Sequence, residues 1–249
     1  MSTPPKNTQT RTPLNRERVA LAGVRLADES GLDALSMRNL AQELGVVPMA
    51  LYKHVGNKEE LLDEMINAIV LEIDPLPADY EWKSALRHRI LSSRQALLRH
   101  PWAPHVIESR QGASPIVLDY MDSLIGIFIK AGFSLDLTHY AMHALGSRMW
   151  GFIQEVFPTP AAPSDPEEQA AMFAQFAARY PNIIELATAA SHPDGSQITQ
   201  GCDDQFEFEF ALDLLLDGFD RLHQNAWSSQ TDIHTSSTPL ESAVRGKRK

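Results

Sequence analysis

Apolar residues recur with a period near 3.6 residues over almost the whole chain, which is the spacing of one face of an α-helix. A strand-like alternation occurs in FEFEF at 206–210, but this stretch runs directly into ALDLLLDGFDRL, whose spacing is helical. One helix accounts for both stretches. The sequence therefore predicts an all-α protein.

Proline-rich and polar stretches divide the helical regions into predicted domains. Residues 1–13 and 228–249 have no apolar periodicity and are predicted to be disordered tails. The segment Asp74-Pro-Leu-Pro77 predicts a hinge, because proline restricts its own backbone and that of the preceding residue. We therefore expect a small domain at 14–74 and a larger helical domain at 75–227.

Several signals for helix ends fall close together in the N-terminal domain. Ser36 offers a hydroxyl N-cap, and Gly45 ends the helix that follows. Pro48 suits the first turn of the next short helix, because its missing N–H costs nothing there. Asn57 with Glu60 three residues later resembles a capping box for a further helix. Two short helices joined by a tight turn have the size of a helix-turn-helix, whose second helix enters the DNA major groove.

The second helix of this pair, predicted at 47–54, has an unusual surface. Leu51 and Val55 should point inward. The outward surface is then made of Val47, Pro48, Met49, Ala50, Tyr52 and Lys53. Phosphate contacts are predicted for Tyr52, His54 and Lys58, and local positive charge for Lys53, Arg38 and Lys58. The alternatives are a tyrosine that covers the core, an Arg38–glutamate pair, a buried histidine and a solvated lysine.

The chain as a whole carries no electrostatic signal for nucleic acid. Its formal net charge is −10. Residues 1–74 hold 8 Lys/Arg against 11 Asp/Glu, a net charge of −3. The prediction of DNA binding therefore depends on a local surface.

Other features indicate the class of protein. The N-terminus lacks the apolar core of a secretion signal, and no run approaches the roughly 18 apolar residues of a membrane span. The single cysteine, Cys202, excludes an internal disulfide and a Cys-rich zinc site. No Gly-rich phosphate loop, nucleophile motif or tight acidic pair is present. We expect a cytoplasmic protein that is not an enzyme and has no cofactor.

The segment GLDALSMRNLAQELGVVPMALYKHVGNKEELLDEM joins S-x-R-x-L-A-x-x-L-G-V (36–46) to L-Y-x-H-V-x-N-K-x-x-L-L (51–62). Over about residues 15–70 the chain resembles the DNA-binding domain of the TetR/AcrR-like (tetracycline repressor) family. This resemblance implies that positions 47–50 and 53 face the bases. It also implies that five side chains hold the DNA backbone, namely Ser36, Arg38, Tyr52, His54 and Lys58.

The chain departs from the family at positions 47–49, where polar residues are common in relatives. Val47, Pro48 and Met49 cannot make bidentate hydrogen bonds, although they can pack on thymine methyl groups. Lys53 is the best remaining hydrogen-bonding candidate for a base. The operator sequence is therefore not predictable from these residues.

The larger domain is predicted to contain helices at about 82–99, 102–109, 115–131, 134–157, 167–179 and 204–227. By resemblance, the helices at 134–157 and 204–227 of two subunits form a four-helix dimer interface. The first carries the small residues Ala141, Ala144, Gly146, Ser147 and Gly151, which allow another helix to approach closely. The second carries an apolar stripe of Phe208, Ala211, Leu212, Leu215 and Phe219. The alternative is a role in the core of one chain.

Bulky and partly polar residues of the larger domain are candidates for an effector pocket. They are Trp102, His105, Met121, Phe128, His139, Met142, His143, Met149 and Trp150. For most of them the alternative is plain core. His139 and His143 have the spacing of a metal pair, but without a nearby third ligand no metal site is predicted.

The sequence thus predicts an N-terminal three-helix helix-turn-helix domain joined to a larger ligand-binding and dimerisation domain. The expected function is a homodimeric regulator, a repressor of palindromic operator DNA that an unidentified small molecule releases. The alternatives are a DNA-binding regulator controlled by a protein partner, and an activator.

Overall fold

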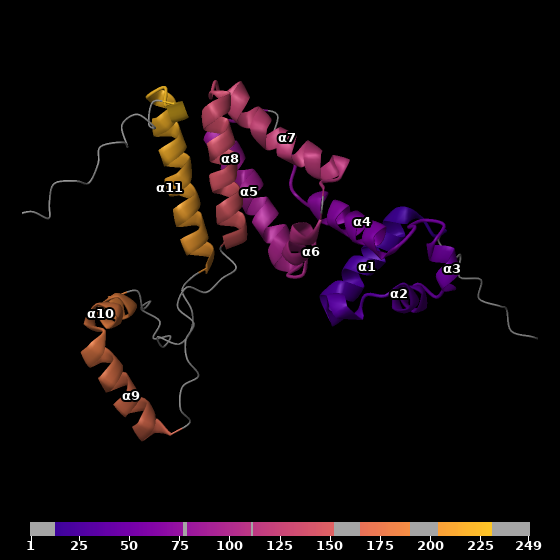
Figure 1. Ribbon diagram of the computed structural model, residues 1–249, viewed down its shortest axis with the longest axis horizontal. Helices are drawn as coiled ribbons and strands as arrows, with labels where there is room; N and C mark the ends of the chain where they lie inside the picture. Colours follow the sequence, from indigo (N-terminus) through magenta and orange to yellow (C-terminus); the bar gives the residue numbers. More distant parts are fainter. Residues whose placement is uncertain (1–12, 77–78, 111, 152–164, 190–203, 231–249) are drawn as a thin grey trace, which may run out of the picture. The chain divides into compact units, whose positions relative to one another are not determined.

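The computed structural model describes residues 13–76, 79–110, 112–151, 165–189 and 204–230. The regular structure of these residues is entirely helical, which confirms the predicted fold class (Figure 1). The N-terminal helices are α1 (Arg16–Ser30), the 3-10 helix η1 (Leu32–Ala34), α2 (Met37–Glu43), α3 (Pro48–Leu51) and α4 (Lys58–Val70). They are followed by α5 (Trp82–Arg99), α6 (Ala103–Ser109), α7 (Pro115–Lys130), α8 (Leu135–Gly151), α9 (Pro166–Arg179), α10 (Pro181–Ala189) and α11 (Asp204–Gln224).

The predicted helices of the larger domain agree with this order. Helix α5 has the predicted bounds, and α10 was not predicted from the sequence. Residues 152–157 of the predicted helix at 134–157, and nearly all of both predicted disordered tails, lie outside the described residues. At the start of the predicted C-terminal tail, Ser229 donates its N–H and its hydroxyl to the carboxylate of Asp136 on α8, at 2.7 and 2.9 Å.

The described residues form two compact units. The first contains the residues up to His139 together with those from Ala226 onward, and the second contains Tyr140–Asn225. The helix-turn-helix and helices α5 to α7 therefore belong to the same unit. The predicted domain boundaries at 14–74 and 75–227 stay a prediction.

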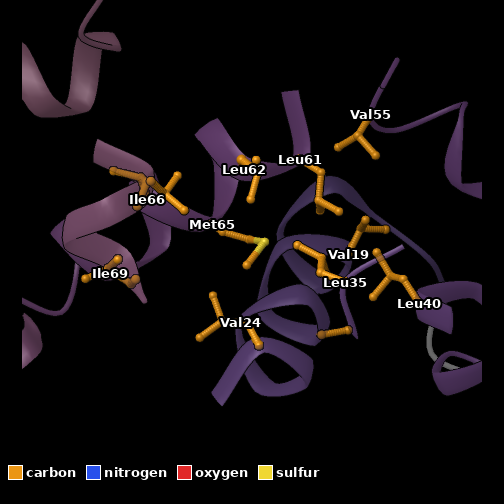
Figure 2. Close-up of a cluster of buried hydrophobic side chains, with 14 of the residues drawn as sticks. Val19, Val24, Leu35, Leu40, Val55, Leu61, Leu62, Met65, Ile66 and Ile69 are labelled. Atoms are coloured by element: carbon orange, nitrogen blue, oxygen red, sulfur yellow. The ribbon is translucent and has the colours of Figure 1, made fainter. Parts of the chain in front are cut away.

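Helices α1 and α4 pack closely in the core of the first unit. Val19 and Met65 are fully buried, and Figure 2 shows the Met65 side chain directed toward α1. A Cβ atom added to Gly23 would lie 2.8 Å from the Met65 sulfur, so α1 has a glycine where α4 comes closest. The same cluster includes Ala96, Ala103 and Val106, so the core continues from the N-terminal helices into α5 and α6.

An aromatic cluster joins α5 to α7 elsewhere in this unit. Trp82 lies 4.8 Å from Phe133 and 6.1 Å from Phe128, between ring centroids. Phe128 and Phe133 are themselves 5.1 Å apart in an edge-on arrangement. Such pairs stabilise a core beyond the area they bury.

Candidate nucleic-acid interface

The helix-turn-helix is held by the residues that mark its ends in the sequence. Ser36 Oγ accepts the N–H of Asn39 at 3.1 Å, which makes it the predicted N-cap of α2. Gly45 has φ 63°, a left-handed conformation that favours glycine, and it lets the chain turn between α2 and α3. The Val46 N–H then returns to the Ala41 carbonyl at 2.9 Å. The turn is thereby closed on the end of α2.

The helix predicted at 47–54 is shorter in the structure. Helix α3 covers Pro48–Leu51, with Pro48 at its start as expected, and Tyr52–His54 form a turn. The N–H groups of His54 and Val55 both bond the Leu51 carbonyl, at 2.8 and 3.0 Å, so the chain tightens after one helical turn. The prediction of a helix through His54 was therefore wrong at its C-terminal end.

The inward and outward positions of this segment agree with the prediction. Leu51 and Val55 are buried in the core. Val47, Met49 and Tyr52 are 68%, 72% and 46% exposed, which is unusual for large hydrophobic side chains. The outward surface is therefore available for contact with another molecule. Its other members are Pro48 and Lys53, both exposed, and Ala50, which is half-buried.

Two arginines that contact α4 are already paired with carboxylates. Arg16 pairs with Glu60 and Glu64, and Arg110 pairs with two carboxylates of α4. By contrast, the exposed side chains of Arg38, Lys53 and Lys58 make no ion pair with any of the described residues. An Arg38–glutamate pair, the alternative considered for Arg38, is absent from this part of the chain. Residues 36–58 hold these three cations and one carboxylate, so the local charge is positive although the chain is acidic.

The other predicted phosphate contacts are less exposed. Ser36 and His54 are half-buried. The oxygen of Ser36 accepts the Asn39 N–H, which leaves the hydroxyl hydrogen available for a phosphate. His54 is half-buried, so its exposure does not distinguish a phosphate contact from a buried histidine.

Helix α4 begins beside this surface. Asn57 Oδ1 accepts the Glu60 N–H at 2.8 Å, which confirms Asn57 as the N-cap. A capping box would have the Glu60 carboxylate bond the N–H of Asn57. Here it bonds the Gly56 N–H, at 2.6 Å, so the predicted capping box is displaced by one residue. Lys58 follows at the first helical position, where the helix dipole favours an anion.

Sequence reasoning missed the polar contacts that join these N-terminal helices to the rest of the unit. Arg110 binds Asp63 at 2.9 Å and also Glu59, so it holds the first two turns of α4. His100, at the end of α5, lies 2.9 Å from Asp28 of α1 and 3.1 Å from Glu72 beyond α4. Because the partners are 28 to 72 residues apart in sequence, no local pattern could have revealed them.

The nine predicted effector-pocket residues differ in their surroundings. Trp102 donates its Nε1–H to Asp28 at 2.7 Å, and Phe128 belongs to the aromatic cluster. The exposed members are His105, Met121, His139 and His143, and the half-buried ones are Met142 and Met149. The side chain of Trp150 lies outside the described residues. The pocket therefore stays a prediction.

A hollow of about 550 Å³ lies instead beside the start of α4. It is lined by Glu59, Asp63, Ser109, Arg110, Gly112, Ala113 and Ser114. None of the nine predicted pocket residues lines it. Its one cation, Arg110, is already paired with both of its carboxylates, Glu59 and Asp63, so its chemistry indicates no particular ligand. Among the described residues, no three His, Cys, Asp or Glu side chains are arranged to hold a metal ion.

Helix α11 has two apolar faces. Phe208, Leu212 and Phe219 of the predicted stripe are buried, while Ala211 and Leu215 are half-buried. A second apolar row was not predicted, and it remains exposed: Phe206, Phe210 and Leu214, at 67%, 58% and 56%. The spacing of four residues could have revealed this row in the sequence.

Within the described part of the chain, none of the helices has both the length and the apolar character that a membrane span requires.

Comparisons with known proteins agree with the helix-turn-helix and extend the similarity to most of the chain. Residues 21–65 match the family described as "Bacterial regulatory proteins, tetR family", and residues 74–222 match "Tetracyclin repressor-like, C-terminal domain". The chain is 33% identical to the tetracycline repressor protein class D of Escherichia coli over 212 residues, which cover 83% of this chain and 89% of that protein. It is 29% identical to the HTH-type transcriptional repressor DrrR1 of Streptomyces coeruleorubidus over 225 residues, or 84% and 78% of the two chains.

A solved structure shares the fold. The Streptomyces coelicolor TetR family protein ActR, in complex with actinorhodin, superposes with a TM-score of 0.64 at 27% identity and covers 87% of this chain and all of its own. Proteins of this family bind operator DNA and small-molecule effectors and are regulators, not enzymes. The chain belongs to the TetR family of transcriptional regulators.

Proposed function

We propose that this regulator is a repressor that binds a palindromic operator as a homodimer and leaves it when a small molecule binds the larger domain. The observation that carries the proposal is the surface around α3, where Arg38, Lys53 and Lys58 have no carboxylate partner among the described residues. Phosphate groups would supply the missing negative charge. Its site of action would be the cytoplasm, where operator DNA lies.

The side chains of this surface fall into two groups, those that would contact bases and those that would contact phosphates. Val47, Pro48, Met49, Ala50 and Lys53 would face the bases. Ser36, Arg38, Tyr52, His54 and Lys58 would hold phosphates and fix the register of the protein on the duplex. With mostly apolar side chains toward the bases, thymine methyl contacts would contribute much of the direct readout.

Two observations on the predicted dimer helices support a homodimer. The exposed row of Phe206, Phe210 and Leu214 lies on α11, whose other face is already buried. On α8, a Cβ atom added to Gly146 would meet nothing within 4 Å, so packing within one chain does not require glycine there. A second copy would cover both features. The helix-turn-helix domains of the two subunits would then bind half-sites about 34–36 Å apart.

The similar proteins support repression over activation and support control by a small-molecule effector. Proteins called repressors are among the similar sequences, and ActR has been solved with actinorhodin. In this chain α4 would transmit the signal, because it begins at the DNA surface and its first turns are held by Arg110. An effector would lower operator affinity only by its differential affinity for the two conformations.

Operator selection tests the proposal. Purified full-length protein is incubated with random or genomic DNA at a stated salt concentration, beside Tyr52→Ala and Lys58→Ala. We expect the wild-type protein to enrich a palindrome with two half-sites, and both variants to lose most of that enrichment. If the wild-type protein enriches no sequence at moderate salt, the proposal of an operator-binding repressor is wrong.

A further inference from the structure

Polar side chains are buried together between α5 and α7 of the first unit. Arg89, Ser92 and Ser93 come from α5 and are each less than 9% exposed. Tyr120 and Ser123 come from α7 and are half-buried as whole residues. We call these five residues the α5–α7 polar cluster. Burying so many polar groups costs free energy unless each has a partner.

The contacts of Arg89 leave its positive charge without an anion and one of its N–H groups without an acceptor. Its Nη1 donates to the Asp74 carbonyl at 2.5 Å, its Nη2 donates to Ser123 Oγ at 3.2 Å, and its guanidinium carbon lies 4.7 Å from the centre of the Tyr120 ring. None of these partners is an anion, and no carboxylate of the described residues lies within ion-pair distance. The Nε–H is buried and has no acceptor. Arg89, which is 8% exposed as a residue, therefore keeps a charge without an anionic partner and one unused donor.

For each hydroxyl group around Arg89, the hydrogen bonds show which atom is the donor. Ser93 donates to the Arg89 carbonyl at 2.6 Å, so the 2.5 Å contact between Ser93 and Tyr120 has the tyrosine as donor. Burial raises the pKa of the Tyr120 phenol, which keeps that donor protonated. Ser123 donates to the Tyr120 carbonyl at 2.6 Å. Tyr120 can therefore offer its hydrogen to a ligand in place of Ser93.

We propose that the α5–α7 polar cluster binds the acidic group of the effector, with a carboxylate accepting the Nε–H and an Nη2–H of Arg89. These two N–H groups point the same way and fit the two oxygens of a carboxylate. The ligand would displace Ser123 from Nη2 and receive a further hydrogen bond from Tyr120. This inference rests on the proposed function only in taking the ligand to be the effector.

The same arginine contacts the connection between α4 and α5. Arg89 holds the Asp74 carbonyl, and Ser92 accepts the Asp74 N–H at 2.9 Å and donates to its carboxylate at 3.1 Å. Asp74 follows shortly after the end of α4. An anion that draws Arg89 toward α7 therefore changes the bonds that hold this connection. The site would couple ligand binding to the helix that begins at the DNA surface.

Matched acid and amide probes test the chemistry without knowledge of the natural ligand. The probes are salicylate, trans-cinnamate, 1-naphthoate and anthraquinone-2-carboxylate, each beside its primary amide, which has similar shape and no charge. Binding to the full-length protein is measured by isothermal titration calorimetry without DNA. We expect at least one acid to bind wild-type protein about tenfold more tightly than its amide, because a site built around a charge rejects its neutral analogue.

Three variants assign that preference to the cluster. Arg89→Gln should remove it, and Tyr120→Phe should weaken the acid several-fold while leaving the amide nearly unchanged. Arg87→Gln makes the same substitution two positions away on α5, where the side chain faces another direction, and should preserve the preference. Circular dichroism and thermal unfolding establish which variants fold.

Two results would overturn the inference: no acid of the panel binds more tightly than its amide, or the preference survives in Arg89→Gln. If Arg89→Gln does not fold, Arg89→Lys is tested in its place, since a lysine ammonium cannot donate two parallel hydrogen bonds to the two oxygens of a carboxylate. An unchanged acid affinity in Arg89→Lys would then exclude the proposed two-point contact with Arg89. Operator selection is independent of these titrations. A protein that enriches an operator but shows no acid preference refutes only this inference, whereas acid binding at Arg89 without operator enrichment refutes only the proposed repressor.

Discussion

Lys58 stands at the first helical position of α4, directly after the N-cap Asn57. A cation is disfavoured there by the helix dipole, and Lys58 has no carboxylate partner among the described residues. The two carboxylates that follow it are used elsewhere, since Glu59 binds Arg110 and Glu60 binds Arg16. A DNA phosphate near Lys58 would remove the unfavourable interaction.

Lys58→Ala is expected to weaken operator binding and to lower the slope of log affinity against log salt by about one. The physical reason is that one phosphate contact releases about one counterion. Affinity is measured at four or more salt concentrations by fluorescence anisotropy on the selected operator. Lys130→Ala, a lysine of α7 outside the surface, is the control. An unchanged slope in Lys58→Ala would show that this lysine does not contact a phosphate.

Asn57→Ala should lower the free energy of unfolding by about 1 kcal/mol, because the Glu60 N–H loses its acceptor at the start of α4. Asn57→Asp retains an oxygen at that position and should restore most of the loss. Urea denaturation of the three proteins measures the difference. Equal stability of Asn57→Ala and wild type would mean that water replaces this cap without cost.

The pKa of Asp136 lies below its ordinary value of 3.8, chiefly because the Ser229 N–H bonds its carboxylate. A lowered pKa stabilises the folded chain at pH values above 3.8, and this contribution is lost as pH falls through the folded pKa. Residues 226–230 should therefore detach from α8 in acid, and in Asp136→Asn they should already be detached at neutral pH. Amide hydrogen exchange of these residues measures both effects. Asp119→Asn on α7 is the control and should not alter their exchange.

At the scale of elements, the contact between α1 and α4 holds the helix-turn-helix together. Met65 is fully buried against α1, and Gly23 opposite it leaves room for the sulfur. The same α4 is held by Arg110 and, beyond its end, by the bonds of Asp74 with Arg89 and Ser92. Helix α4 is therefore packed against α1, and residues of the following helices bind it near its start and just beyond its end.

Met65→Ala should lower the free energy of unfolding by about 2–5 kcal/mol, through lost burial and the cavity that remains. Met49→Ala removes the same side chain from a position that is 72% exposed, and it should change stability by less than about 0.5 kcal/mol. Chemical denaturation compares the two. Similar losses in both variants would contradict the packing of α1 on α4.

At the scale of the whole molecule, the single chain leaves apolar surface that a second copy would cover. The row of Phe206, Phe210 and Leu214 on α11 is the clearest case, because more than half of each side chain is exposed. Contiguous exposed apolar surface of this kind is typical of a site of contact with another molecule.

Phe210→Asp should convert the proposed dimer to a folded monomer, because a carboxylate would be buried without a partner at the proposed interface. Sedimentation velocity measures the mass, and operator binding should be lost together with the dimer. Leu98→Asp on α5 is the control: its side chain is similarly exposed, at 59%, and dimerisation should persist. A Phe210→Asp protein that remains dimeric would place the interface elsewhere.

The sequence by itself determined the features whose signals are local. The period of 3.6 residues specified the helices other than α10. Ser36, Gly45, Pro48 and Asn57 specified helix ends in the helix-turn-helix region, since each acts on backbone groups within a few residues. The inward positions of Leu51 and Val55 followed from the same period. The residue types and their spacing over 36–62 were enough to indicate the family, because the helix-turn-helix is one uninterrupted segment.

Only the tertiary structure decided which polar groups meet across the chain. The contacts of Arg110 with Asp63, of His100 with Asp28 and of Arg89 with Ser123 join residues 34 to 72 positions apart. No periodic pattern encodes such partners, so sequence reasoning chose bulky residues for the pocket and overlooked Arg89. An arginine at a helical position normally indicates solvent exposure. Its burial, and hence the unpaired charge and donor, exists only once α5 and α7 are packed together.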